Sequence, residues 1–356
     1  MDPVSQAALG AITARSVAPA DMAKGVVIAG VALGAAPDLD VVFSIGGDFF
    51  DTLKHHRGIT HSLIVLLAMG PLAGHWLWRR FGDGLRWRRQ HLWWLAIATA
   101  ALLSHPLLDG LTTYGTQWLA PFSDRRFAVN AMPIIDPVYT LILLGGLGAG
   151  AWLKSPRRRK ASALVALGLS CAYLAYGWAQ NRETAQFAAA QLEAEGLADY
   201  ELSAFPTILQ VHYRRVVVRT PDEVRVGYFS TWSPCAIEWG RAPRAGGAAA
   251  SALAATDEGR VFDWFAMGWS FPVVQRVADG FQVTLSDLRY GATLDPGDSF
   301  FSIGARFDAA WRPLAPPTGR GFSPDQDRLD FKTLFNAAYF DACPEVAVEA
   351  SGAAPP

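Results

Sequence analysis

Eight consecutive residues carry a high density of groups that bind metals and anions. Residues 55–62 read HHRGITHS, with three imidazoles, one guanidinium and two hydroxyls. Neutral imidazole is the commonest metal ligand in proteins, and histidine is the side chain that titrates nearest neutral pH. Gly58 permits a tight turn that could bring His56 and His61 to one ion. The same residues could also form a plain loop, so the assignment depends on what else the chain offers.

Carboxylates and a further histidine occur at two other places. Residues 37–40 read PDLD at the end of an apolar run, and residues 105–109 read HPLLD. The histidine and aspartate of the second motif are four residues apart, so on a helix they share one face. With no thiolate nearby, these donors suit Zn²⁺ in a hydrolytic site, or Mn²⁺ or Mg²⁺ where carboxylates dominate. We therefore predict a divalent-metal site with six ligands: Asp38, Asp40, His56, His61, His105 and Asp109.

Other polar residues near these motifs are predicted to act on the substrate. Arg57 is placed to hold an anionic group bidentately. Simpler roles stay open for some candidates, because Asp136 could merely start a helix and Asp38 and Asp40 could cap one. We assign catalytic roles to Arg57, Thr60 and Asp136, and substrate binding to Arg57, His55, Thr113 and Gln6.

Apolar helices are the elements expected to position these residues. The chain has 356 residues, 51% of them hydrophobic, and nearly all its long apolar runs precede residue 180. This profile predicts a membrane helical bundle in residues 1–180, a soluble, mixed β-rich domain in residues 181–346 and a disordered tail in residues 347–356. About six membrane helices are expected, the first two of them short: residues 4–18, 25–36, 62–78, 91–103, 134–153 and 161–179.

The basic residues of the connecting loops indicate an orientation. Loops at residues 15–24, 79–89 and 154–160 hold 12 lysines and arginines, and the alternate loops hold 4. By the positive-inside rule the first set is cytoplasmic. All six predicted ligands then fall on the other face of the membrane, where ionisable clusters usually mark a functional site. The C-terminal domain is expected on that face, in the periplasm, and His75 and His91 near the cytoplasmic arginines are expected to be structural.

The three cysteines fall into two groups. Cys171 lies in an apolar run and is expected to be a small core residue. Cys235 and Cys343 lie in the soluble part and could pair if that part faces an oxidising compartment.

The ordered set of motifs resembles the YdjM/YbcI family of bacterial inner-membrane metal-dependent hydrolases. The resembling segments are residues 1–6, 37–40, 56–62, 105–109, 113–117 and 135–137, and SDLRYG at residues 286–291 resembles a stretch of the longer members. The resemblance implies a membrane-bound metal hydrolase with the six predicted ligands at the family's motif positions. Many members carry Thr-His where this chain has Ser5 and Gln6. More distantly, the pattern is similar to zinc-dependent phospholipase C and P1-type nucleases.

Together these expectations describe a metal-dependent hydrolase of the bacterial inner membrane. Metal-activated water would attack a phosphate ester or phosphodiester of a lipid-linked substrate at the outer leaflet, because the site opens at headgroup height. The expected partners are the lipid bilayer and the substrate. Nucleic acid is not expected, because a chain with 18% charged residues and a net charge of -1 lacks the necessary basic face. An ion-binding membrane transporter and a non-catalytic assembly factor, whose metal would only staple the loops, remain open alternatives.

Overall fold

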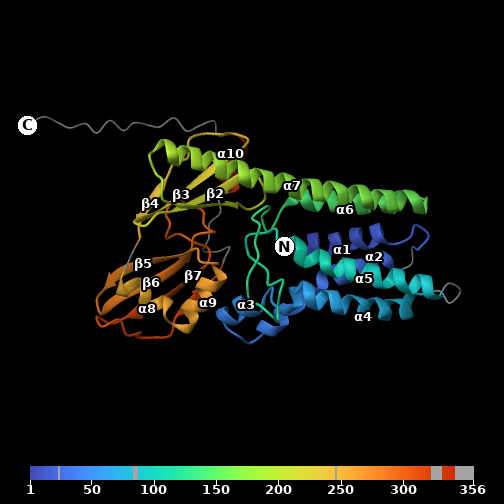
Figure 1. The fold of residues 1–356 in the computed structure, drawn as a ribbon, viewed down its shortest axis with the longest axis horizontal. Coiled ribbons are helices and arrows are strands. Elements are labelled where there is room, and N and C mark those ends of the chain that lie inside the picture. Colours follow the sequence, from blue (N-terminus) through green and yellow to red (C-terminus); the bar gives the residue numbers. More distant parts are fainter. Residues whose placement is uncertain (23–24, 83–86, 245–246, 322–330, 341–356) are drawn as a thin grey trace, which may run out of the picture.

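Helices occupy one end of the molecule and two β-sheets the other, as Figure 1 shows. This computed structural model describes residues 1–22, 25–82, 87–244, 247–321 and 331–340. The predicted tail at residues 347–356 therefore lies outside the described residues. The predicted order, a helical region followed by a β-rich domain, is confirmed.

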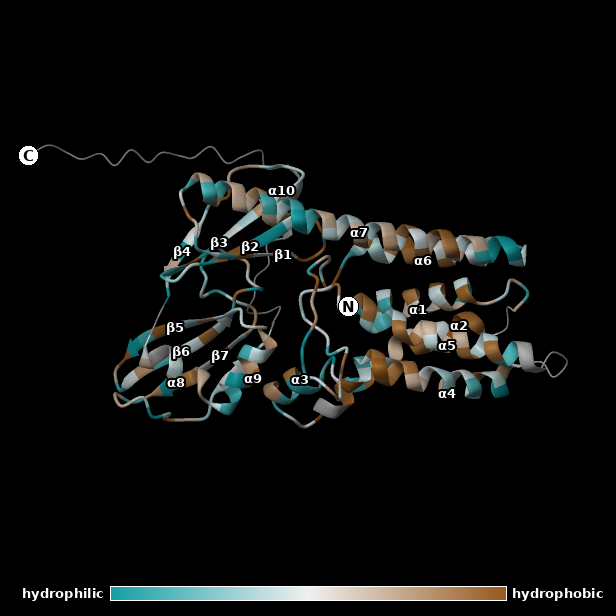
Figure 2. Cartoon of the chain, viewed as in Figure 1, coloured by the Kyte–Doolittle hydropathy of each residue, from teal (hydrophilic) through white to brown (hydrophobic). Residues whose placement is uncertain are grey.

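The helical end is built around α1, which contacts four other helices. Its first turn is fixed by Asp2, whose side chain accepts a 2.9 Å hydrogen bond from the Ser5 backbone, and by Pro3 at the first helical position. Hydrophobic residues run along these helices, and the first turns of the last one are hydrophilic (Figure 2). The helices are α1 (Pro3–Val17), α2 (Val26–Ala35), α4 (Leu63–Phe81), α5 (Trp87–Asp109), α6 (Pro137–Trp152) and α7 (Pro156–Ala194).

Fewer helices than predicted have the length of a membrane span. Among the described residues two qualify, Gln90–Asp109 within α5 and the whole of α7, or up to three if Phe49–His61 and α4 form one bent span. The other helices, α1, α2 and α6, have 15, 10 and 16 residues, below the roughly 20 of a standard span. The predicted count of six membrane helices is therefore not confirmed.

Short elements connect the bundle to the sheets. They are the 3₁₀ helix η1 (Ala36–Ser44), the helix α3 (Phe49–His55) and the 3₁₀ turn η2 (Ile59–His61). They lie at the end of the bundle that faces the C-terminal domain (Figure 1). The start of α3 is set by a capping box between Asp48 and Asp51.

The helix α7 is longer than expected. The sequence predicted a span over residues 161–179 and a separate helical stretch over residues 183–197, but one continuous helix of 39 residues covers both. Its second half packs on the first sheet through Ala188 and Leu192. The helix therefore belongs to both parts of the molecule.

Two antiparallel sheets of four strands replace the single small sheet that the sequence predicted. Val216 and Val218 of β2 face α7, whereas Val217 joins a core that includes Phe271 of the second sheet. Because β2 is buried on both faces, its continuous valine run reads as a central strand. The first sheet has the order β1 (Glu201–Pro206), β2 (Tyr213–Arg219), β3 (Glu223–Ser230) and β4 (Gly240–Pro243).

The second sheet is covered by two short helices. Its order is β5 (Ser270–Val277), β6 (Gly280–Asp287), β7 (Ser302–Phe307) and β8 (Thr318–Arg320). The helices α8 (Ala248–Ala254) and α9 (Asp257–Phe265) pack on it, and Phe50 and Leu53 of α3 join the same core. The last described helix is α10 (Phe331–Tyr339).

Three buried arginines fasten residues 110–136 to the rest of the molecule. Arg214 donates to the carbonyls of Asn130, Ala131 and Gly177, at 2.7, 3.0 and 2.6 Å. Arg289 donates to the Thr113 carbonyl, and Arg126 donates to the carbonyls of Leu53, Tyr114 and Gly115. A buried carbonyl without a partner is costly, so these contacts hold the long connection in place.

The cysteines differ from each other in environment. Cys171 is a free thiol exposed on α7, so the prediction that it is a core residue is wrong. The reason is that α7 buries only part of its surface against α1 and α6. Cys235 is disulfide-bonded, and Cys343 lies outside the described residues.

Candidate metal centre

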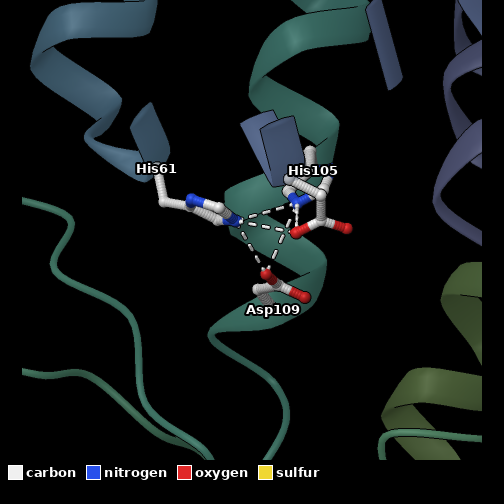
Figure 3. A group of neighbouring side chains, drawn as sticks. His61, His105 and Asp109 are labelled. Atoms are coloured by element: carbon white, nitrogen blue, oxygen red, sulfur yellow. Dashed lines mark hydrogen bonds and ion pairs between the residues drawn. The ribbon is translucent and has the colours of Figure 1, made fainter. Parts of the chain in front are cut away.

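Five of the six predicted ligands come from three places that meet at the domain-facing end of the bundle, and the sixth, His56, follows α3. Asp38 and Asp40 lie in η1, with Pro37 at its second position, and His61 ends the short turn η2. His105 and Asp109 lie in the last turns of α5, one helical turn apart. The imidazoles and the α5 carboxylate point toward one another in Figure 3.

Four side chains converge on one small volume. The Nε2 atoms of His61 and His105 are 3.0 Å apart. Asp38 Oδ1 lies 3.3 Å from each of these nitrogens, and Asp109 Oδ2 lies 3.3 Å and 3.5 Å from them. A tetrahedral zinc ion with bonds of about 2.0 Å requires ligand atoms about 3.3 Å apart. The donor set therefore has the spacing of a tetrahedral metal site.

The outer nitrogens of both imidazoles are held by acceptors. His105 Nδ1 donates to the Gly34 carbonyl at 2.6 Å, because a carbonyl can only accept. His61 Nδ1 lies 3.3 Å from Asp40 Oδ2, a carboxylate, and so donates as well. In its neutral form, each ring then presents the lone pair of Nε2 to the other ring and to two carboxylates. A metal ion between the donors, or a proton on one ring, removes the repulsion between these lone pairs, and this is the orientation that metal-binding histidines adopt.

Asp109 is held by contacts on both of its oxygens. Its Oδ1 accepts from the Gln6 amide at 2.8 Å and from the Met1 amino group at 2.5 Å. Arg57 Nε lies 3.1 Å from Oδ2, and Arg57 Nη1 donates to the Thr112 hydroxyl at 2.9 Å. The carboxylate is fully buried, so these contacts fix its orientation and balance its charge.

Asp40 is the hub of a second set of contacts. It accepts from His56 Nδ1 at 3.0 Å, from the Arg57 backbone at 2.9 Å and from the Thr60 hydroxyl at 3.2 Å, besides its contact with His61. Burial alone would raise the pKa of Asp40, but the hydrogen bonds from His56 and His61 outweigh it and hold the pKa below its usual range. Asp40 is thus a carboxylate that orients its neighbours.

A second group of potential ligands shares one residue with the first. Asp38, Asp40 and His56 each offer an atom within 4.8 Å of the others, as do the four members of the first group. Asp38 belongs to both groups, which is the arrangement of a carboxylate between two ions. The side chains of Asp38 and His56 are 21% and 23% exposed, so this side of the cluster reaches the surface.

Arg57 occupies a different position from the one predicted. Its guanidinium is buried against Asp109 and Thr112 and stacks on the Tyr114 ring at 4.8 Å. Its backbone has a φ of 61°, a conformation that costs about 1 to 3 kcal/mol and is common at functional sites. These are the contacts of a residue that positions Asp109, rather than those of a free clamp for a substrate anion.

Asp136, which was predicted to be catalytic, does not lie in the cluster. Asp136 caps the start of α6, where Oδ1 accepts from the Tyr139 backbone at 2.9 Å and Oδ2 accepts from the Tyr173 hydroxyl at 2.9 Å. Both oxygens are therefore engaged, and the simpler reading as a helix-start carboxylate fits these contacts.

The predicted substrate-binding residues are spread over several surroundings. His55 is exposed, and its Nδ1 contacts the Asp51 carbonyl within α3. Gln6 contacts Asp109, as described above, and Thr60 contacts Asp40. Thr113 is buried and lines a cavity in the C-terminal half. His75 and His91 contact each other at 3.1 Å between α4 and α5 and belong to neither ligand group.

The sequence analysis missed the contribution of Gly34. Its carbonyl orients His105, and its Cα packs against α1 so closely that an added Cβ would lie 2.5 Å from the Gln6 carbonyl. A signal was present, because Gly30 and Gly34 form a GxxxG pair, a pattern typical of close helix packing in membranes.

Comparisons with known proteins place the N-terminal half among bacterial membrane proteins. Residues 1–184 match the family model described as YdjM inner membrane protein. The chain is 41% identical over 103 residues to the inner membrane protein YbcI of Escherichia coli K12, covering 28% of this chain and 55% of that protein. It is 34% identical over 119 residues to the uncharacterized protein YfhP of Bacillus subtilis 168, covering 33% of this chain and 34% of that protein.

These matches leave part of each protein uncovered. The chain spans about half or less of the length of the two relatives, and the family model ends before the first strand. Residues 286–291, which resemble the longer family members, therefore lie beyond the range matched by the family model. No solved structure matches the chain.

Proposed function

The chain belongs to the YdjM inner membrane protein family, and from that premise we propose that it is a membrane-bound, metal-dependent hydrolase of phosphate esters. The observation that carries the proposal is the convergence of two imidazole nitrogens and two carboxylates, with the outer atoms of His61, His105 and Asp109 held by neighbours. Water could satisfy such groups at an exposed site, but His61, His105 and Asp109 are fully buried. A cation is the group that such buried donors accommodate.

The donor set suits Zn²⁺ best, with Mn²⁺ or Mg²⁺ as alternatives. When bound, a divalent ion supplies Lewis acidity and a water nucleophile near neutral pH. His61, His105, Asp38 and Asp109 would hold it. The chain's own contribution is to fix these groups: Gly34 and Asp40 set the ring orientations, and Arg57 holds Asp109.

The solvent exposure of the ligand side chains indicates the side from which a substrate would reach the cluster. Among the ligands, only Asp38 and His56 have partly exposed side chains, so a substrate would approach on the side of η1. This side lies at the end of the bundle, next to the C-terminal domain (Figure 1). With the basic loops in the cytoplasm, it faces the outer leaflet of the inner membrane. A lipid-linked phosphate ester or phosphodiester is then the natural substrate class.

The same burial also favours a second candidate, a metal that only staples the loops together. The four donors come from η1, η2 and α5, and an ion would tie these elements to one another. A transporter is less well supported, since the described ligands gather at one end of the helices rather than along a path through them. The hydrolase and the structural metal site differ in one testable respect, because only the hydrolase turns over a phosphate-ester substrate.

We expect wild-type protein purified in detergent to contain bound metal, and His61→Ala or His105→Ala to lose it. Removing a residue that only orients a ligand typically weakens metal affinity ten- to a hundredfold, and loss of a ligand should exceed that. Metal content is measured by elemental analysis, and activity by hydrolysis of a phosphodiester reporter and of phospholipid vesicles. Activity should fall together with metal content.

The matched control is His91→Ala, which removes an imidazole from the same helix α5 but outside both ligand groups. It should leave metal content and activity unchanged. If it strips metal as readily as His61→Ala, the proposed centre does not exist. If wild-type protein holds metal but hydrolyses neither phosphodiesters nor phospholipids, the stapling role is the better account.

A further inference from the structure

A cavity of about 430 Å³ lies in the C-terminal half, away from the metal ligands. Its walls come from residues 113–135, from the first sheet, from the segment after β6 and from α10. The volume falls within the range of roughly 300 to 1,000 Å³ typical of small-molecule sites. None of the six predicted metal ligands lines it, and of the predicted substrate-binding residues only Thr113 does.

Most of the cavity wall is apolar. Ile135, Ile208, Phe301 and Leu334 are among its lining residues. They come from four separate segments, so the apolar surface encloses the space from several sides. Such walls favour a ligand with an apolar body, because burying apolar surface gains roughly 25 cal/mol per Å².

Three polar groups on this wall have no hydrogen-bond partner among the residues that the structure describes. They are the Thr113 hydroxyl, Arg215 Nη2 and the Tyr290 hydroxyl, each buried. Thr113 and Arg215 as whole residues are only 4% and 2% exposed. An unsatisfied buried donor costs about 1 to 3 kcal/mol. Three such groups around one cavity indicate a ligand that accepts hydrogen bonds.

The charge of the wall favours an anion. Arg289 is neutralised by Asp287, whose oxygens lie 2.7 Å and 2.9 Å from its nitrogens. Arg215 instead donates to the carbonyls of Leu288 and Thr293 and to the Tyr228 hydroxyl, none of which carries a charge. Within the described part of the chain no carboxylate pairs with Arg215. A buried guanidinium without a counter-ion is unfavourable and suits an anionic ligand.

The same observations explain the SDLRYG motif at residues 286–291, which the metal centre does not use. Arg289, Tyr290 and Gly291 line the cavity, and the Leu288 carbonyl accepts from Arg215 Nε. Gly291 allows the guanidinium of Arg215 to approach, since a Cβ there would lie 2.9 Å from Arg215 Cζ. The motif is thus the polar side of the cavity.

We propose that this cavity binds an amphiphilic anion, a molecule with an apolar body and one carboxylate or phosphate head. The head accepts hydrogen bonds from Arg215, Tyr290 and Thr113, and the apolar body lies against Ile135, Phe301 and Leu334. The site is separate from the metal centre and does not depend on hydrolysis there. Thr113 follows Asp109 by four residues, so a short segment joins the two sites along the chain.

The test is calorimetric titration of the full chain in nanodiscs of neutral lipid, with octanoate, octyl phosphate and octanol as probes. The two anions distinguish a carboxylate from a phosphate head, and octanol has the same chain without charge. We expect saturable binding of at least one anion and binding of octanol at least tenfold weaker, since hydrogen bonds to a charged group are worth about 1.5 to 3 kcal/mol. No saturable anion binding, or equal affinity for octanol, overturns the proposal.

The variants locate the binding in the cavity. Tyr290→Phe and Thr113→Val delete hydroxyls that bond to no group in the described part of the chain, so folding should be retained while anion affinity falls roughly tenfold for each. Arg215→Gln should abolish binding, but it also removes contacts to Leu288 and Thr293 and is therefore the less decisive variant. The control is Tyr200→Phe, which alters a hydroxyl beside the α7-facing core, outside the cavity lining. If Tyr290→Phe and Thr113→Val bind the anion like Tyr200→Phe, the ligand does not occupy this cavity.

Discussion

At the scale of single residues, the metal centre depends on groups that do not touch the ion position. Four donors form the inner set, and three of them are oriented by a neighbour: His105 by the Gly34 carbonyl, His61 by Asp40 and Asp109 by Arg57. A side chain that rotates freely would lose conformational entropy on binding an ion, and prior orientation avoids that cost. The burial of the inner set makes this orientation more important, because misplaced donors would be left without partners.

A substitution at Asp40 tests whether the neighbours of the ligands matter for metal binding. Replacing Asp40 with Ala should weaken metal affinity about ten- to a hundredfold, because His61 and His56 lose the acceptor that fixes their rings. The loss should be smaller than in His61→Ala. Competition with a chelating dye measures the affinity of each variant.

Asp51→Ala is the matched control, because it removes a carboxylate from the neighbouring helix α3, where Asp51 only completes the capping box. It should leave metal affinity intact. Metal loss in Asp40→Ala as severe as in His61→Ala would show that Asp40 is itself a ligand, as the sequence analysis predicted.

The sequence motifs predicted which side chains come together at the cluster, but they did not predict the separate position of each side chain. His105 and Asp109 could be paired from their separation by one helical turn, and the structure has them 3.5 Å apart. The difference between Asp38, which faces the inner set, and Asp40, which orients the rings, depends on the turn of η1. Arg57 could not be placed either, because its left-handed backbone turns the guanidinium into the protein.

At the scale of elements, the close contact between α1 and α2 supports the metal centre. A Cβ added at Gly10 would lie 2.3 Å from the Gly30 carbonyl, and one added at Gly30 would lie 2.6 Å from the Gly10 carbonyl. The backbones therefore touch at these glycines. This approach positions the end of α2, including the Gly34 carbonyl, beside His105.

Gly34→Ala should separate these helices and impair the metal centre. The added methyl would overlap the Gln6 carbonyl, and overpacking of this kind typically costs about 1 to 3 kcal/mol. We expect a lower melting temperature together with lower metal content. Thermal unfolding and elemental analysis measure the two effects.

Gly148→Ala provides the comparison, since Gly148 lies in α6 with nothing within 4 Å of its added Cβ. Alanine is favoured over glycine in a helix by up to about 1 kcal/mol, so this variant should be as stable as wild type or more so. Equal melting temperatures for the two variants would argue against a tight α1–α2 contact.

The sequence predicted where helices form better than it predicted how long they are. Apolar runs marked the positions of the bundle helices, because burial and membrane insertion both require them. The runs correctly indicated that α1 and α2 are short, but they did not reveal that α7 continues past Gln180. The division of the β-rich domain into two sheets was not predicted, because the pattern of residues that marks a strand does not say which strands pair.

At the scale of the whole molecule, α7 links the bundle to the C-terminal domain. Its 39 residues at 1.5 Å each give a length of roughly 58 Å, about twice the hydrocarbon thickness of a membrane. Large apolar side chains are exposed on the surface of its first half and of the other bundle helices, including Ile28, Leu72, Leu141 and Val165. These side chains form a surface suited to lipid, and the second half of α7 then stands outside the membrane with the sheets.

The charges of α7 predict its direction through the membrane. Residues 157–160 read RRRK and lie in the first turns of the helix, at the end away from the sheets. Basic residues flanking a span stay in the cytoplasm, so the start of α7 should be inside and its end outside.

Reporter fusions test this in intact cells, with a fluorescent protein that folds in the cytoplasm and a phosphatase that is active only in the periplasm. A fusion after Ser155 should be fluorescent and lack phosphatase activity, and a fusion after Glu195 should show the reverse. Fluorescence at both sites would mean that α7 does not cross the membrane, and a reversed pattern would place the metal centre on the cytoplasmic side. Either result would rule out a substrate in the outer leaflet. The metal centre and the anion cavity would still be tested by the metal-binding and anion-binding experiments described above.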